Sequence, residues 1–352
     1  MSPQSAAAAA PLAVALTNEP LPWRTRLVRL SQPIGLARLF RPLPKGGLRP
    51  VLDVSYRPKT GDITLRFSAR QALGIPEQTL LLSLLELAKA QHDLLGGSVV
   101  LDAKVSDAVA VELWGRLTQG DVTSKNRALR VDTSWHELNR LYGEQIGGSA
   151  TATRREQLRR LCEVVVWEEH GDSKRTLHQS FLVVLLKGTD ERLHLALNAR
   201  LAAAILEDGY AQISLAERCS LDRDVAKAVH AFLSTSIAPG RRLHIGVETL
   251  LDRFWPGSRS QSPAKTHSSR RAYVVDALHA VNRLERWSVQ WKSGEIVVVR
   301  RSKNPDGNMT SGHIAGKKSS YRHPQTAICP NRINDLEAPD ASRIFFNKDK
   351  SA

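Results

Sequence analysis

The chain has 352 residues, of which 50 are Lys or Arg and 35 are Asp or Glu, so its formal net charge is +15. This length suits two domains with cores of their own, and so large a positive charge favours nucleic acid over a membrane surface as a partner. The three scattered cysteines form no Cys-x-x-Cys pair and no apolar run reaches the roughly 18 residues of a membrane span, which argues against a disulfide scaffold, a zinc finger or a membrane-spanning protein and fits the cytoplasm.

The first predicted segment, residues 1–48, is rich in Ala and Pro and then becomes basic. This composition is typical of a disordered arm. Such an arm is either a solvated tail or a contact to phosphates, and the sequence leaves both interpretations open.

Residues 49–197 are predicted to form the first domain, in which helices and strands are mixed. The predicted elements are, in order, strands over 52–56 and 63–67, a helix over 78–91, a strand over 99–101, a helix over 109–117, a strand over 129–131, a short helix from Ser134, a helix over 154–167 and a hairpin over 181–186 and 192–197. Ser134 and Glu137 form the capping box that begins the short helix.

Residues 198–301 are predicted to form the second domain with a similar order of elements. They are a helix over 199–207, a strand over 212–214, a helix over 222–234, a strand over 243–245, helices over 247–255 and 269–286, and a hairpin over 287–291 and 295–301. Residues 302–352 mix Lys, Ser, Asn, Gly and Pro without periodicity, which predicts a flexible C-terminal tail.

The two domains contain an imperfect sequence repeat. The segment 138–143 aligns with 251–257 if one Pro is inserted, and Thr153-Arg154-Arg155 then aligns with Ser269-Arg270-Arg271. Each copy is a short amphipathic helix, a loop, a longer helix that opens on a hydroxyl residue and an arginine pair, and a strand pair. We therefore predict an α+β chain of two tandem winged helix-turn-helix domains, related by a pseudo-repeat and flanked by flexible tails.

Polar residues that face away from the apolar stripes of the longer helices, together with basic residues of the hairpins, are candidates for DNA contacts. The candidates are Arg154, Arg155, Gln157, Arg159, Arg160 and Lys187 in the first domain, and Ser269, Arg270, Arg271, Tyr273, His279, Arg283, Arg286, Lys292 and Arg300 in the second. The alternative is a solvated helix face with ion pairs such as Glu156–Arg160. Two such helices in register, in a chain this basic, favour double-stranded DNA as the partner.

The sequence contains only incomplete matches to catalytic motifs. The segment 312–319 resembles a phosphate loop, but its glycines are one residue too close, and Lys318 stands where Ser or Thr would hold magnesium. His136-Glu137 lacks the second His of a zinc protease helix. We expect no enzyme, no cofactor and no metal.

From about residue 190 onward the sequence resembles RepC, the iteron-binding replication initiator of IncQ-type plasmids. The segments that carry the resemblance are 193–206, 230–257 and 269–289, and the likeness is weaker over 50–190. The resemblance implies two winged-helix domains that grip direct repeats at a plasmid origin, promote melting and help to load a plasmid-encoded helicase and primase. One departure is Tyr273-Val274-Val275, where the family carries a denser arginine run.

Two functions remain open from the sequence. An initiator uses two similar domains to meet successive major grooves of a direct repeat, about 10 base pairs apart, and such a protein needs no symmetric dimer and can bind as a monomer. A transcriptional repressor of its own operon uses the same fold, and a fold does not determine a function. The oligomeric state is open as well.

Overall fold

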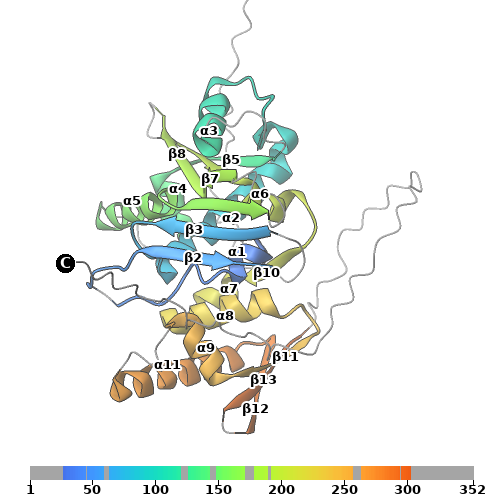
Figure 1. Ribbon diagram of the computed structural model, residues 1–352. Coiled ribbons are helices and arrows are strands. Elements are labelled where there is room, and N and C mark those ends of the chain that lie inside the picture. The colour runs from blue at the N-terminus through green and yellow to red at the C-terminus, as the bar shows by residue number, and fades with distance from the viewer. Residues whose placement is uncertain are drawn as a thin grey trace, which may run out of the picture. The chain divides into compact units, whose positions relative to one another are not determined.

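The computed structural model (Figure 1) describes residues 27–44, 46–58, 63–119, 126–142, 148–170, 178–188, 192–256, 263–293 and 295–302. These residues combine helices with four antiparallel sheets, as the predicted α+β class requires. The main hydrophobic core takes side chains from Val28 to Val299, so both predicted domains contribute to it. A smaller core surrounds Trp114.

The N-terminal arm is the first correction. Strand β1 (Leu27–Ser31) pairs with β10 (Tyr210–Ser214), and α1 (Gln32–Leu36) follows directly. Leu30, Ile34 and Leu39 are buried in the main core, so the predicted disorder is wrong over residues 27–40. The apolar residues of this segment find a place in the core only because β10 lies beside it, and β10 is far along the chain. Residues 1–26 lie outside the described residues.

The first predicted domain contains two four-stranded sheets. One has the order β2-β3-β6-β7 and the other the order β4-β5-β9-β8. Their strands are β2 (Leu52–Tyr56), β3 (Ile63–Ala69), β4 (Val100–Leu101), β5 (Ala128–Ser134), β6 (Val165–His170), β7 (His178–Phe181), β8 (Val183–Lys187) and β9 (Arg192–Leu197). The predicted hairpin is observed as β8–β9. The helix predicted to reach residue 167 ends at Cys162, because the β-branched run 164–166 enters β6 instead.

Four helices surround these sheets. They are α2 (Ile75–Leu95), α3 (Ala108–Thr118), α4 (Trp135–Tyr142) and α5 (Gly148–Cys162). Helix α2 is central: it contacts α4, α5, β1 and β5, and its residues from Leu80 to Leu85 are all buried. Its N-terminus is closed by Glu77, whose carboxylate accepts a hydrogen bond from the Gly74 amide at 2.8 Å.

Residues 242–301 of the second predicted domain contain a three-stranded sheet of order β11-β13-β12 (Figure 1), whereas the first helix of that domain packs against β1 and β5. After α6 (Ala199–Leu206) and α7 (Leu215–Cys219), its elements are α8 (Asp224–Ser236), β11 (Arg242–Gly246), α9 (Val247–Phe254), α11 (Ala264–Asn282), β12 (Trp287–Ser293) and β13 (Ile296–Arg301). Helix α11 begins five residues earlier than predicted, and β12–β13 is the predicted hairpin. The tail from residue 303 lies outside the described residues.

The two copies of the repeat share an order of elements. In the first, β5 leads into α4 and α5, and the hairpin β8–β9 completes a sheet of order β5-β9-β8. In the second, β11 leads into α9 and α11, and the hairpin gives the order β11-β13-β12. The first copy differs by an insertion, β6–β7, which joins the other sheet.

Candidate nucleic-acid interface

The first arginine of the repeated pair has the same partner in both copies. Arg154 lies over the ring of Tyr142, 3.2 Å from its centroid, and Arg270 lies over the ring of Trp255 at 5.6 Å. Tyr142 and Trp255 are equivalent positions in the repeat. A guanidinium over an aromatic face is an attractive contact, so this arginine holds the longer helix against the end of the shorter one.

The second arginine of the pair also contacts an equivalent position. Arg155 lies 5.4 Å from the ring centroid of Trp135, and the Arg271 Nε lies 3.5 Å from the Glu248 Oε1. Trp135 and Glu248 each belong to the first turn of the shorter helix. The arginine pair that marks the repeat in the sequence therefore stabilises the helix–loop–helix corner.

Several side chains of α5 that were predicted to contact DNA point into the protein instead. Arg154 and Gln157 are buried, and they bond to each other. Arg160 donates to Glu77 and to Gln71 of the neighbouring α2 region, each at 2.9 Å. These three residues are not available to DNA, and the prediction that they contact it is wrong.

Arg159 is an exposed arginine in the last turn of α5. It is bonded to Glu156 at 2.7 Å and to Glu163, so its charge is balanced within the helix. The bonds to these carboxylates raise the pKa of Arg159 above its already high ordinary value. This arrangement is the ion-paired helix face that was the alternative interpretation of the sequence.

Arg286 is another predicted DNA contact whose side chain is bonded within the protein. Its Nε donates to the Glu217 Oε1 at 2.7 Å, and the Trp287 indole and the His230 ring lie within hydrogen-bond distance of Oε2, at 3.1 and 2.9 Å. Burial opposes ionisation of Glu217, but these bonds outweigh it and lower its pKa to about 2. The cluster ties the end of α11 and the start of β12 to α7 and α8.

Helix α11 presents an exposed polar face. The side chains on this face follow at helical spacing and are those of Lys265, Ser269, Tyr273, Asp276, His279 and Arg283. Val274, Leu278 and Val281 are buried on the opposite side. We call the six residues the α11 face. The sequence prediction missed Lys265, because it began the helix at residue 269.

The hairpin β12–β13 borders the α11 face. Trp291 of β12 is 39% exposed, and its ring lies 5.9 Å from that of His279. Lys292, next to the turn, is exposed. Trp291 was not predicted to belong to the interface, because the sequence does not show that its side chain is exposed.

The remaining hairpin candidates are also exposed. Lys187 ends β8, and Arg300 lies opposite Arg242 near the end of β13. Arg300 is paired with Ser288 on β12, four residues from Lys292, which corresponds to about 13 Å along a strand. It therefore lies away from the turn that Lys292 adjoins.

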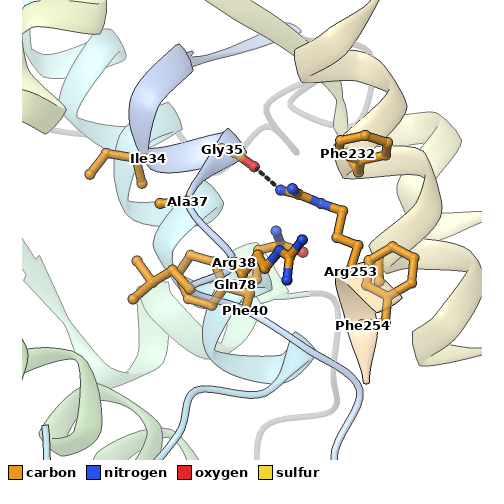
Figure 2. Close-up of a pocket in the computed structure, with 11 residues that line it drawn as sticks. Ile34, Gly35, Ala37, Arg38, Phe40, Gln78, Phe232, Arg253 and Phe254 are labelled. Carbon is orange, nitrogen blue, oxygen red and sulfur yellow. Dashed lines mark hydrogen bonds between the residues drawn. The ribbon is translucent and has the colours of Figure 1, made fainter. Parts of the chain in front are cut away.

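The residues around the small pocket beside α1 hold α1 against α8 and α9. Figure 2 shows the Arg253 guanidinium directed at the Gly35 carbonyl, and the bond between them is 3.0 Å long. Arg253 also lies over the Phe232 ring, and burial lowers its pKa to about 10, so it stays charged at pH 7. The cavity of about 10 Å³ has room for about one water molecule and not for a substrate.

The described residues contain no cluster of three or more His, Cys, Asp or Glu side chains arranged to hold a metal ion. None of their helices combines the length and the apolar character needed to cross a bilayer.

The family model of replication protein C, RepC, matches residues 32–301, well over half of the chain. The chain belongs to the RepC family. The resemblance proposed from the sequence is therefore confirmed, and membership supports a role in the initiation of DNA replication. No curated protein matches this RepC-family chain.

Solved structures similar to this RepC-family chain include two of RctB, both of its domains 2 and 3. A selenomethionine derivative is 9% identical with a TM-score of 0.45, and the match covers 75% of this chain and 95% of that one. The other is 10% identical with a TM-score of 0.40, and covers 74% and 95%. A likeness of this degree says nothing about function.

Proposed function

We propose that this RepC-family chain is a plasmid replication initiator that binds direct repeats in double-stranded DNA, and that helix α11 reads the bases. The observation that carries the proposal is the exposed α11 face beside the hairpin β12–β13. Family membership supplies the link to replication. The net charge of +15 supplies attraction to the DNA backbone.

We infer that both copies of the repeat are winged-helix units. In a winged helix, a strand leads into two helices and a hairpin, and the second helix enters the major groove. The sheet orders β5-β9-β8 and β11-β13-β12 agree with that arrangement. In this assignment α5 and α11 are the groove helices, and β8–β9 and β12–β13 are the wings.

The two units have different tasks in this proposal. On α5, Arg159 is paired with Glu156 and Glu163, and Arg160 is paired with Glu77 of α2. Among the described residues, no carboxylate is paired with Lys265 or Arg283 of the α11 face. We therefore assign base reading to the second unit and backbone contacts to the first, through Arg155 and Lys187.

The later steps of initiation are part of the proposal. Binding next to an AT-rich tract is coupled to melting when protein–DNA contacts offset the cost of deforming the duplex. A plasmid-encoded helicase and primase are the expected partners at the opened origin. Permanganate reactivity of that tract, with and without the protein, tests the melting. A deletion that leaves plasmid replication intact would favour a repressor of the chain's own operon.

Base reading by α11 predicts a loss of specificity in a point variant. Arg283→Ala is expected to weaken binding to the repeat by about 2 kcal/mol, because an arginine that bonds a base edge contributes about 1–3 kcal/mol of discrimination. The matched control, Arg159→Ala on α5, is expected to change binding by less than about 0.5 kcal/mol, because its charge is already balanced. Fluorescence anisotropy on repeat and random duplexes measures both. An equal loss on the two duplexes for Arg283→Ala contradicts base reading.

Backbone contact by the second wing predicts a change in salt dependence. Lys292→Ala is expected to lower affinity on all sequences and to reduce the slope of log K against log salt by about 0.9, the value for one phosphate contact. The control is Arg116→Ala on α3, whose side chain pairs with Glu112 away from the α11 face. Titrations between 50 and 200 mM salt, roughly the range in which such slopes are resolved, measure the slope. An unchanged slope for Lys292→Ala removes this wing from the interface.

A further inference from the structure

The α11 face contains one carboxylate, that of Asp276, at its centre. Lys265 and Ser269 precede Asp276 on this face by 11 and 7 residues and Arg283 follows by 7, which places these side chains nearly in line along the helix. The Asp276 side chain is 57% exposed. An acidic residue at this position therefore lies between cations on the surface that we propose for DNA.

A carboxylate on such a surface is unfavourable unless it gains a specific bond. The phosphates of DNA repel it, and the repulsion acts over a distance comparable with the width of a groove. In the major groove, however, cytosine offers its N4 amino group as a donor, and Asp and Glu side chains accept from it. Guanine O6 and thymine O4 are acceptors and would repel the carboxylate.

Within the described part of the protein, Asp276 forms only an exposed ion pair, with Arg223. The Arg223 Nη1 donates to the Asp276 Oδ2 at 3.0 Å, and the Arg223 side chain is 66% exposed. An ion pair this exposed contributes little to stability, so a base can replace the arginine at low cost. Arg223 belongs to the N-terminus of α8, so it reaches the α11 face from the side.

The equivalent position in the first copy has a different role. Arg160 aligns with Asp276, and it is bonded to the buried Glu77 of α2. This position thus braces the first unit, whereas in the second unit it is open to solvent. The comparison supports a task for Asp276 that the first unit does not have.

We propose that Asp276 is a specificity-determining residue that selects a cytosine in the major groove of the bound repeat. The inference rests on the proposed function, because it requires α11 to enter that groove. It names one feature of the DNA: a C·G pair opposite the centre of α11, with the cytosine N4 donating to the Asp276 carboxylate.

The test is selection of binding sites by the full-length protein from a duplex library with a randomised segment. The wild-type protein is expected to enrich a consensus in which one position prefers cytosine by about tenfold or more, as one good base contact provides. Asp276→Ala is expected to lose the preference at that position alone and to bind random DNA more tightly. Asp276→Asn is expected to prefer adenine there, because Asn bonds N6 and N7 of adenine.

Two further variants separate the possible causes. Asp208→Ala removes the same charge from an exposed turn after α6, and it is expected to leave the consensus unchanged. Arg223→Ala removes the ion pair but keeps the carboxylate, and it is expected to retain the cytosine preference. If Asp276 pairs with Arg223 and does not contact a base, then Asp276→Ala, Arg223→Ala and Asp208→Ala all enrich the same consensus. That result contradicts the proposal.

The outcomes distinguish this inference from the proposed function. A consensus that Asp276→Ala leaves unchanged at every position overturns the role of Asp276 and leaves DNA binding by the chain intact. A wild-type protein that enriches no sequence overturns the proposed function, and the inference with it.

Discussion

Replacing Glu77 by Gln is expected to lower the free energy of unfolding by about 3 kcal/mol, because removal of one partner from a buried ion pair typically costs this much or more. The Glu77 side chain is fully buried, and its Oε1 forms an ion pair with Arg49 at 3.0 Å and accepts a hydrogen bond from Arg160 at 2.9 Å. Glutamine keeps the shape but removes the carboxylate that Arg49 pairs with and one of the two carboxylates that Arg160 pairs with. The midpoint of urea unfolding, at constant m-value, measures the change.

The control for Glu77 is an exposed pair of the same kind. Glu112→Gln removes the ion pair with Arg116 on α3, and it is expected to change stability by less than about 0.5 kcal/mol. A shift for Glu77→Gln as small as that of the control would mean that α5 is not anchored through this carboxylate.

Glu217→Gln is the second large expected effect. It is expected to destabilise the protein by about 3 kcal/mol at pH 7, since the shift of the Glu217 pKa from 4.5 to about 2 corresponds to that free energy. The variant leaves Arg286 and His230 around a neutral group. Because Arg286 closes α11 onto this cluster, the affinity for DNA should fall as well.

The pH dependence of this difference has a definite sign. The folded-state pKa lies below the ordinary value, so the contribution is complete above about pH 4.5 and is lost as the pH falls toward 2. The stability difference between wild type and Glu217→Gln should therefore shrink by roughly half between pH 7 and pH 3.5. Glu285→Gln, at an exposed position before the cluster, is the control. A difference that is equal at both pH values would show that Glu217 is not held ionised by these bonds.

Local pattern determined much of the fold. The repeat, the two hairpins and the helices α4, α9 and α11 follow from apolar spacing, capping residues and turn residues, which act within a few neighbours along the chain. The missed strand β6 shows the limit. Val164 to Val166 continue the apolar stripe of α5, and a short apolar run is compatible with a helix or a strand until its β-sheet partner is known.

Which side chains are free to form the candidate DNA surface depends on contacts between residues far apart in the sequence. Arg160 was a reasonable DNA contact by its place on the helix, but Glu77 lies 83 residues before it in the sequence. Arg286 was equally reasonable, and Glu217 lies 69 residues away. Charge and helical spacing gave no sign of either carboxylate.

The sequence by itself determined that the chain is basic, that it repeats a strand–helix–loop–helix–hairpin order, and which side chains share a face of each helix. Only the tertiary structure decided which faces are covered: α5 is bonded to α2, β1 is paired with β10, and the α11 face is open. The physical reason is that helical periodicity acts between residues three or four apart, whereas the segment that covers a face is brought there by packing of the whole chain.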